Sequence, residues 1–115
     1  MVTNMDRALP VQNKSLLIPD VGAMIQSVLY CTKSEISKEI GKPSKFALDV
    51  IREEVKDLEP RKCVMVGDNI NTDILFGKNC EMTTVLTLTG ITSRDDLRRS
   101  SVKPSFVVEN LKALV

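Results

Sequence analysis

The chain has 115 residues, and its 16 Lys and Arg against 15 Asp and Glu give a formal net charge of +1. This balance gives no electrostatic reason to expect a polyanionic partner, and one Tyr, three Phe and no Trp offer few rings for stacking bases. The absence of His excludes Ser-His and Cys-His dyads and histidine-ligated zinc sites. The length and a hydrophobic content of 43% favour one globular domain.

The cysteines and the N-terminal residues predict a cytoplasmic protein without a membrane partner. Cys31, Cys63 and Cys80 are an odd number, and their spacing matches neither a C-x-x-C pair nor a disulfide framework. No uncharged apolar stretch reaches the roughly 18 residues of a membrane span. Asp6 and Arg7 stand where a signal peptide would need apolar residues.

Two helices are predicted in the first half of the chain. The spacing of apolar residues on one face, after Pro19 and Asp20, predicts a helix over about 20–32. These residues are Val21, Met24, Ile25, Val28 and Leu29. A second helical pattern runs from Phe46 to Leu58, with Ser44 as a candidate N-cap, and should end before Pro60.

Strands and helices are predicted to alternate in the second half. Short runs rich in β-branched residues predict strands at 63–66, 83–88 and 106–108. The first run is apolar throughout, which is typical of a strand covered on both faces. Helices are expected near 71–80, 93–99 and 109–115. This order predicts a doubly wound α/β fold with a parallel sheet.

The stretch that follows the strand at 63–66 is a candidate ligand site, because α/β sheets bind ligands outside the carboxyl ends of their strands. Gly67 lets the backbone approach a ligand, Asp68 can offer a hard oxygen to Mg²⁺, and Asp73 can support it. The alternative is that both aspartates are turn and cap residues. A calcium EF-hand loop is excluded, because most of its ligand positions counted from Asp68 do not match.

Lys42 is a candidate phosphate-binding residue, since it follows a short apolar element at the mouth of a predicted helix. The alternative is a solvated lysine in a Gly-Lys-Pro turn. A Walker A loop is excluded, because Ile36 and Pro43 occupy positions where that loop needs Gly and Ser or Thr.

Taken together, these segments identify a family. Residues 3–91 resemble the C-terminal half of the haloacid dehalogenase-like (HAD) phosphatases with a large α/β cap. This group contains 4-nitrophenylphosphatase, phosphoglycolate phosphatase, pyridoxal phosphate phosphatase and the NagD-type nucleotidases. The matching blocks, in chain order, are Thr3-Asn4-Met5-Asp6 with Leu9-Pro10, Ile40-Gly41-Lys42-Pro43-Ser44, Met65-Val66-Gly67-Asp68, Asn71-Thr72-Asp73-Ile74 with Gly77, and Leu86-Thr87-Leu88-Thr89-Gly90-Ile91.

The resemblance implies roles for individual residues. Lys42 would steady the nucleophile and the transferring phosphoryl group of a small phosphorylated metabolite, Asp68 would bind Mg²⁺, and Asp73 would be its supporting acid. Asn69 would contact the substrate. Residues 1–19 would end the cap and return to the core, and 20–115 would form the C-terminal half of a Rossmann-like core, in one partial domain that lacks the N-terminal strands and the cap.

The chain departs from the family pattern in two ways. Family members attack phosphorus with the first Asp of an Asp-x-Asp pair, and no two aspartates here are separated by one residue. The chain alone is therefore expected to be inactive, as the C-terminal portion of a phosphatase or, alternatively, as a binding or regulatory module that retains the phosphate and Mg²⁺ half-site. Homo-oligomerisation or aggregation is expected. The second departure is Glu81, where the family usually has a helix-ending Gly; a non-Gly residue is strained there if its φ is positive.

Overall fold

The computed structural model describes residues 1–11 and 16–114. By contacts, the chain divides into two compact units, Met1–Gly41 and Lys42–Val115. The expected division into a returning segment at 1–19 and a core from 20 onward is a different boundary and stays a prediction.

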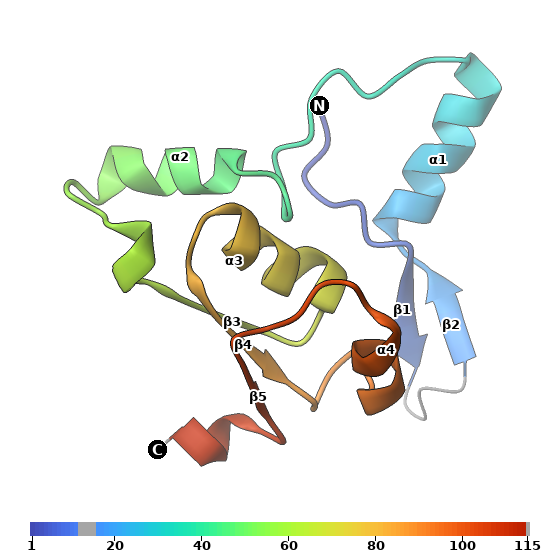
Figure 1. The fold of residues 1–115 in the computed structure, drawn as a ribbon. Helices are drawn as coiled ribbons and strands as arrows, with labels where there is room; N and C mark the ends of the chain where they lie inside the picture. Colours follow the sequence, from blue (N-terminus) through green and yellow to red (C-terminus); the bar gives the residue numbers. More distant parts are fainter. Residues whose placement is uncertain (12–15, 115) are drawn as a thin grey trace. The chain divides into compact units, whose positions relative to one another are not determined.

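The first unit contains a hairpin and a helix (Figure 1). Strands β1 (Ala8–Val11) and β2 (Leu16–Pro19) pair antiparallel, with Leu9 opposite Ile18. The sequence patterns did not predict these strands. Helix α1 (Val21–Thr32) confirms the helix predicted at 20–32, and the Asp20 carboxylate accepts a hydrogen bond of 2.7 Å from the Val21 N–H at its first turn. Predictions for residues 12–15 lie outside the described part.

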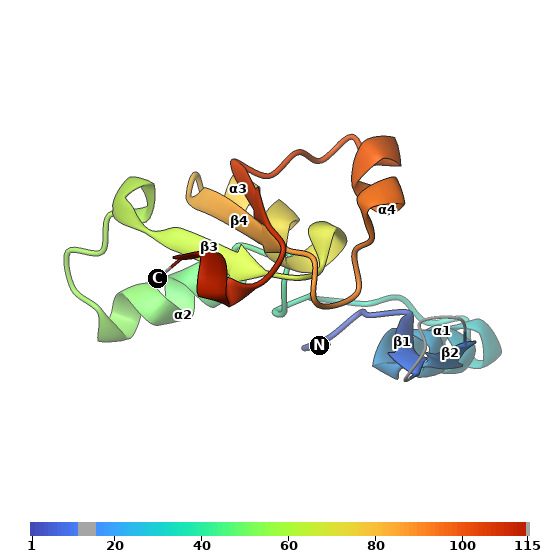
Figure 2. The ribbon, with the colours of Figure 1, turned by 90° about the horizontal axis from the view of Figure 1, so that it is seen from below.

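The second unit is built on a parallel sheet of three strands in the order β3-β4-β5 (Figures 1 and 2). The strands are β3 (Val64–Gly67), β4 (Thr83–Thr87) and β5 (Phe106–Val108). All three strand predictions are confirmed within a residue or so. The connections contain helices, so the predicted α/β class with a parallel sheet is confirmed.

Helical segments precede, connect and follow these strands. The segments are α2 (Phe46–Glu54), the 3-10 turn η1 (Pro60–Lys62), the π-helical turn η2 (Ile70–Ile74), α3 (Leu75–Asn79), α4 (Arg94–Arg99) and the 3-10 turn η3 (Leu111–Leu114). Helix α2 ends four residues before the predicted Leu58. The chain leaves it through Val55 in an extended conformation and Asp57 with a left-handed φ of 64°. Ser44 Oγ accepts a hydrogen bond from the Phe46 N–H (3.3 Å), but the residue at the cap position is Lys45.

Two apolar clusters hold the second unit together. In one, Leu48 of α2 packs with Phe76 and Cys80 and with the partly buried Met65 and Met82. In the other, Ile70, Ile74 and Leu86 are at most 3% exposed. This second cluster lies under the first residues of the η2 turn, so it supports the loop that follows β3.

Just after α3, Glu81 has a φ of 60°, the positive value at which strain was expected. The Met82 N–H donates to the Gly77 carbonyl (2.8 Å) and the Glu81 N–H to the Lys78 carbonyl (3.1 Å). This pair of hydrogen bonds is a Schellman motif with Glu81 at its left-handed position.

One face of β3 is open to solvent, contrary to the expectation of a strand covered on both faces. Val64 is 57% and Val66 39% exposed, whereas Met65, on the other face, packs against the Phe76 cluster. β3 is an edge strand of the described sheet, so it lacks a neighbour on one side.

Among the described residues, no helix is long and apolar enough to cross a membrane.

Candidate active site

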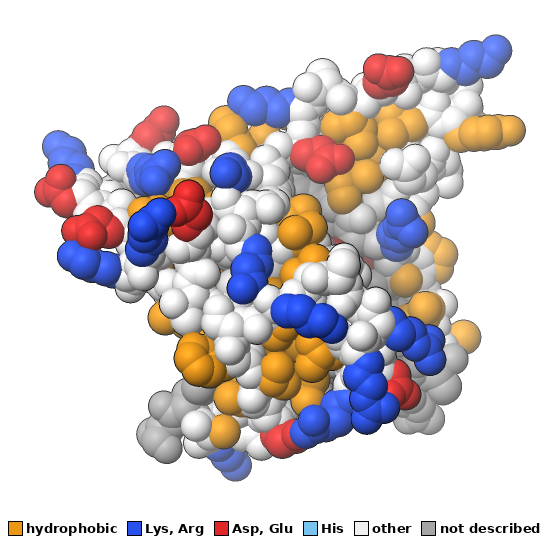
Figure 3. All heavy atoms as spheres, viewed as in Figure 1, with side chains coloured by type: hydrophobic (Ala, Val, Ile, Leu, Met, Phe, Trp, Pro, Cys, Tyr) orange, Lys and Arg blue, Asp and Glu red, His pale blue; other side chains and the backbone are white. Residues whose placement is uncertain are grey.

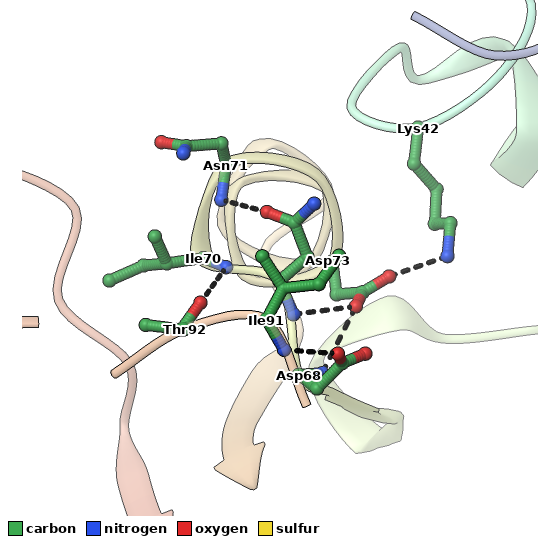
Figure 4. A network of polar contacts seen from close by, with 8 residues as sticks. Lys42, Asp68, Ile70, Asn71, Asp73, Ile91 and Thr92 are labelled. Carbon is green, nitrogen blue, oxygen red and sulfur yellow. Dashed lines mark hydrogen bonds and ion pairs between the residues drawn. The ribbon is translucent and has the colours of Figure 1, made fainter. Parts of the chain in front are cut away.

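The candidate site lies where β3 and β4 end, beside the η2 turn, and all its residues belong to the second unit (Figure 4). Lys42 comes from the turn before α2, Asp68 directly follows β3, and Asp73 lies within η2. The structure therefore brings together the three residues that the sequence singled out, although 31 positions separate Lys42 from Asp73.

Asp73 is the buried centre of this network and is 5% exposed. Its Oδ1 accepts a hydrogen bond of 2.5 Å from Lys42 Nζ, and its Oδ2 accepts the backbone N–H groups of Asp68 and Asn69, both at 3.1 Å. Three donors thus converge on one carboxylate, and two of them fix the backbone after β3. The alternative prediction was that Asp73 is only a cap residue at the start of a helix. A cap alone does not account for its contact with the distant Lys42.

Asp68 is half-buried, and a second loop orients its carboxylate. The Ile91 N–H donates to Asp68 Oδ2 (2.8 Å), and the Thr92 N–H donates to the Asp68 carbonyl (3.0 Å). The buried Thr92 hydroxyl accepts a hydrogen bond of 2.9 Å from the Ile70 N–H. The loop after β4 is therefore joined to the loop after β3 by three hydrogen bonds, and Asp68 Oδ1 has no hydrogen-bond partner among the described residues.

Two glycines leave the space that these carboxylates need. A Cβ atom on Gly67 would overlap the Asp73 side chain, and one on Gly90 would overlap the Asp68 carboxylate. Gly67 was predicted to allow close approach of a ligand, whereas here it allows close approach of Asp73. Gly90, Ile91 and Thr92 were not predicted as site residues, although Gly90 and Ile91 lie in a block that the resemblance had matched.

Asn69 lies between the two aspartates and begins the η2 turn. Its Oδ1 accepts a hydrogen bond of 3.0 Å from the Asn71 N–H, and its own N–H donates to Asp73. The structure thus gives Asn69 a capping role, and the predicted contact with substrate stays a prediction.

The turn that carries Lys42 is anchored to α3. Asn79 Nδ2 donates to the Pro43 carbonyl at 3.0 Å. The Lys42 side chain is 48% exposed, so the charge remains accessible although it is paired with Asp73. A lysine ammonium has three donors, and its pairing with Asp73 uses one of them. The arrangement can present a cation and a carboxylate oxygen to one ligand.

Comparison with known proteins identifies the same family. The family model described as HAD-hydrolase-like matches residues 39–114. Glycerol-3-phosphate phosphatase of Rattus norvegicus is 34% identical over 122 aligned positions, which cover 98% of this chain and 37% of that protein. Chronophin of Mus musculus is 39% identical over 82 positions, covering 66% of this chain and 28% of that protein.

Solved structures of phosphatases share the fold. The 4-nitrophenylphosphatase of Thermotoga maritima superposes with a TM-score of 0.82 at 34% identity, over 96% of this chain and 41% of that one. The p-nitrophenyl phosphatase of Archaeoglobus fulgidus has a TM-score of 0.78 at 32% identity, over 96% and 43%. The chain spans about two fifths of the length of these relatives. With a family model that matches most of its length and with Lys42, Asp68 and Asp73 brought together at the carboxyl end of a parallel strand, the chain belongs to the HAD-like hydrolase family.

Proposed function

We propose that the chain is the C-terminal portion of a Mg²⁺-dependent phosphomonoester hydrolase that acts on small phosphorylated metabolites. The observation that carries this proposal is the convergence of Lys42, Asp68 and Asp73 at the carboxyl ends of parallel strands. Of the four relatives described above, three are named as phosphatases and the fourth is chronophin, and this supports the reaction class. Phosphoryl transfer depends mainly on positioning and charge stabilisation, which is what such a site supplies.

Asp68 fits the role of a magnesium ligand. A carboxylate oxygen is a ligand that Mg²⁺ prefers, and Asp68 Oδ1 accepts no hydrogen bond from the described residues, while Oδ2 is held by the Ile91 N–H. Among the described residues there is no group of three or more acidic or cysteine side chains placed to hold a metal. Mg²⁺ prefers to keep several waters and one or two carboxylates, so a single aspartate is compatible with it. When bound, the ion would neutralise charge on the phosphoryl oxygens.

Lys42 and Asp73 act as a pair in this proposal. The Asp73 carboxylate holds the lysine ammonium at 2.5 Å. Of the two remaining N–H donors of the ammonium, one binds an oxygen of the phosphoryl group and the other an oxygen of the attacking carboxylate. Asp73 also fixes the backbone that carries Asp68, so it positions the cation and the metal ligand together. Asn69, beside Asp68, is proposed to contact the substrate.

The attacking group in this mechanism is an aspartate of an Asp-x-Asp pair that forms an aspartyl-phosphate, and none of the 115 residues supplies such a pair. The second candidate is therefore a binding or regulatory module that retains Lys42 and Asp68 without chemistry. Sequencing the transcript upstream of the Met1 codon separates the two. An in-frame Asp-x-Asp segment supports the enzyme, and an in-frame stop codon without it supports the module.

Metal and phosphate binding can be tested on the 115-residue chain. We expect Mn²⁺, used as a paramagnetic probe, to broaden the amide NMR signals of Asp68, Asn69 and Ile91, and excess Mg²⁺ to restore them. Asp68→Asn should abolish this selective broadening, while Asp95→Asn, a change at an exposed carboxylate of α4, should not. Equal broadening in the wild-type chain and in Asp68→Asn would contradict the ligand assignment.

A second titration addresses Lys42. Orthovanadate should shift the same amide signals in the presence of Mg²⁺, and Lys42→Met should weaken this effect while metal binding is retained, because each residue contributes a different charge. The chain alone should not hydrolyse 4-nitrophenyl phosphate. Turnover that disappears in both Asp68→Asn and Lys42→Met would show that another residue attacks phosphorus.

We further propose that the isolated chain self-associates. β3 is an edge of the described sheet with Val64 and Val66 exposed, and exposed apolar edges recruit strands from other chains. In the first unit, Met24, Val28 and Tyr30 of α1 are more than 60% exposed. Sedimentation at several concentrations tests this proposal, and a monomer at high concentration would contradict it.

A cytoplasmic location is proposed from the three cysteines, which are all free, and fractionation of cells tests it.

A further inference from the structure

The segment that leaves α4 contains a serine preceded by two arginines. The sequence there is Arg98-Arg99-Ser100-Ser101-Val102. Among all serines and threonines of the 115 residues, only Ser101 has arginine at both the second and the third preceding position. Nothing in the candidate active site uses this segment, so it requires a separate explanation.

The structure presents Ser101 to solvent. Ser100 is the C-cap of α4, with φ of −69° and ψ of 139°, so the chain is extended where it leaves the helix. Ser101 is exposed, and its hydroxyl makes no hydrogen bond with the described residues. The neighbouring Ser100 is half-buried, and its Oγ accepts the Val102 N–H at 3.0 Å. Of the two adjacent serines, Ser101 is therefore the accessible one.

The two arginines are held only weakly. Arg98 pairs with Asp95 at 2.9 Å, but these side chains are 76% and 66% exposed, and such pairs contribute little. Arg99 forms no hydrogen bond or salt bridge with the described residues, although it is near Asp96. Figure 3 shows basic side chains gathered over the region of α4. Helix α4 has six residues, none of them buried, so its last turn can open at low cost.

We propose that Ser101 is a phosphorylation site for an arginine-directed serine/threonine kinase. Acidic subsites of such a kinase bind the arginines that precede the acceptor, and an apolar subsite fits Val102. In the reaction, Ser101 Oγ forms a bond to the γ-phosphorus of MgATP, the bond between that phosphorus and the bridging oxygen of ADP breaks, and the hydroxyl proton passes to the kinase's catalytic aspartate. The proposal does not depend on the function proposed above.

The phosphate would act on the end of α4. Lys103 Nζ donates to the Leu97 carbonyl (2.8 Å) and the Arg98 carbonyl (3.4 Å), which are at the C-terminal end of the helix. A phosphate at Ser101 carries a charge of about −2, is disfavoured near helix carbonyls and competes for Lys103. Leu97 and Val102 pack against the Ile70 cluster, so phosphorylation loosens the support beneath the Asp68 loop.

The test uses the 115-residue chain, MgATP and the purified catalytic subunit of cyclic-AMP-dependent protein kinase, with mass spectrometry to count and locate phosphoryl groups. We expect one group, on Ser101. Ser101→Ala should lower the initial rate at least about tenfold, as should Arg98→Gln with Arg99→Gln, while Ser100→Ala should change it less than about twofold.

Three results would overturn the proposal. One is incorporation into Ser101→Ala at the wild-type rate, and another is loss of incorporation in Ser100→Ala with Ser101 intact. The third is phosphorylation of the urea-unfolded, freshly diluted chain but not of the native chain, which would mean that the fold does not present Ser101. Hydrogen exchange gives an independent readout: the Leu97 and Ser100 amides, bonded to Ser93 and Asp96 carbonyls, should exchange faster after phosphorylation.

Discussion

Replacing Glu81 by glycine should stabilise the chain, because Glu81 holds the left-handed position of the Schellman motif that ends α3. This backbone conformation costs a residue with a Cβ atom about 1–2 kcal/mol. Part of this stabilisation is lost, because glycine loses more backbone freedom on folding than other residues, at a cost of roughly 0.5–1 kcal/mol. The net gain from the backbone is therefore about 1 kcal/mol.

Glu81→Gly also removes a side chain that accepts hydrogen bonds from Arg61 Nε (3.0 Å) and Nη2 (2.8 Å). Both side chains are exposed, so the pair contributes little. Glu81→Ala is the matched control, because it also removes the pair but keeps a Cβ atom at the left-handed position. The difference between Glu81→Gly and Glu81→Ala then isolates the backbone.

The pH dependence separates the two effects further. The hydrogen bond and charge of Arg61 lower the pKa of the Glu81 carboxyl. The contribution of the pair is therefore complete above the ordinary Glu pKa of about 4.3 and is lost as the pH falls through the lower folded-state pKa. The wild-type chain should approach Glu81→Ala in acid, whereas the difference between glycine and alanine should persist.

Thermal unfolding followed by circular dichroism measures these differences, with urea unfolding as a second method. A difference of about 1 kcal/mol corresponds to about 4 °C in Tm for a chain of this length. Equal Tm values for Glu81→Gly and Glu81→Ala at pH 7 would show that the strain at this turn does not exceed the cost of ordering glycine, and would refute the expected gain.

Three further predictions concern the site, the core and α4. Gly90→Ala should displace the Asp68 carboxylate, because the added Cβ overlaps it, and should weaken Mn²⁺ binding severalfold; undiminished broadening of the Ile91 amide signal would contradict this geometry. Burial raises the pKa of the Cys80 thiol, so iodoacetamide at pH 8 should modify the exposed Cys31 in the folded chain and Cys80 only after unfolding, as followed by peptide mass spectrometry. Labelling of Cys80 as fast as Cys31 would mean that the Leu48 cluster is open. Ser93→Ala breaks the capping box of α4 and should cost about 1 kcal/mol in urea unfolding at pH 7. Hydrogen bonds from Ser93 lower the pKa of the Asp96 carboxyl, so this contribution is complete above the ordinary Asp pKa of about 3.9, and the cost should shrink at lower pH; a cost that grows in acid would exclude this cause.

The amino-acid sequence by itself determined the elements whose patterns are local. The apolar spacing from Val21 to Leu29 predicted α1, and the β-branched runs predicted β3, β4 and β5, because the periodicity of each element is set by its own buried face. The order of these elements was enough to predict a parallel sheet. Lys42, Asp68 and Asp73 were also identified as candidates, Lys42 from its place at the mouth of a predicted helix and the two aspartates from their place after a predicted strand.

Only the tertiary structure decided how these residues are connected. The pairing of Lys42 with Asp73 and the hydrogen bond from Ile91 to Asp68 join segments 31 and 23 residues apart, and no local pattern encodes such contacts. Helix α2 ends at Glu54 because Val55 is already extended, and Asp57 then adopts a left-handed conformation; periodicity reveals neither. The exposure of Val64 and Val66 depends on which elements pack on that face of the sheet, and an apolar run shows only that a strand could be buried, not what covers it.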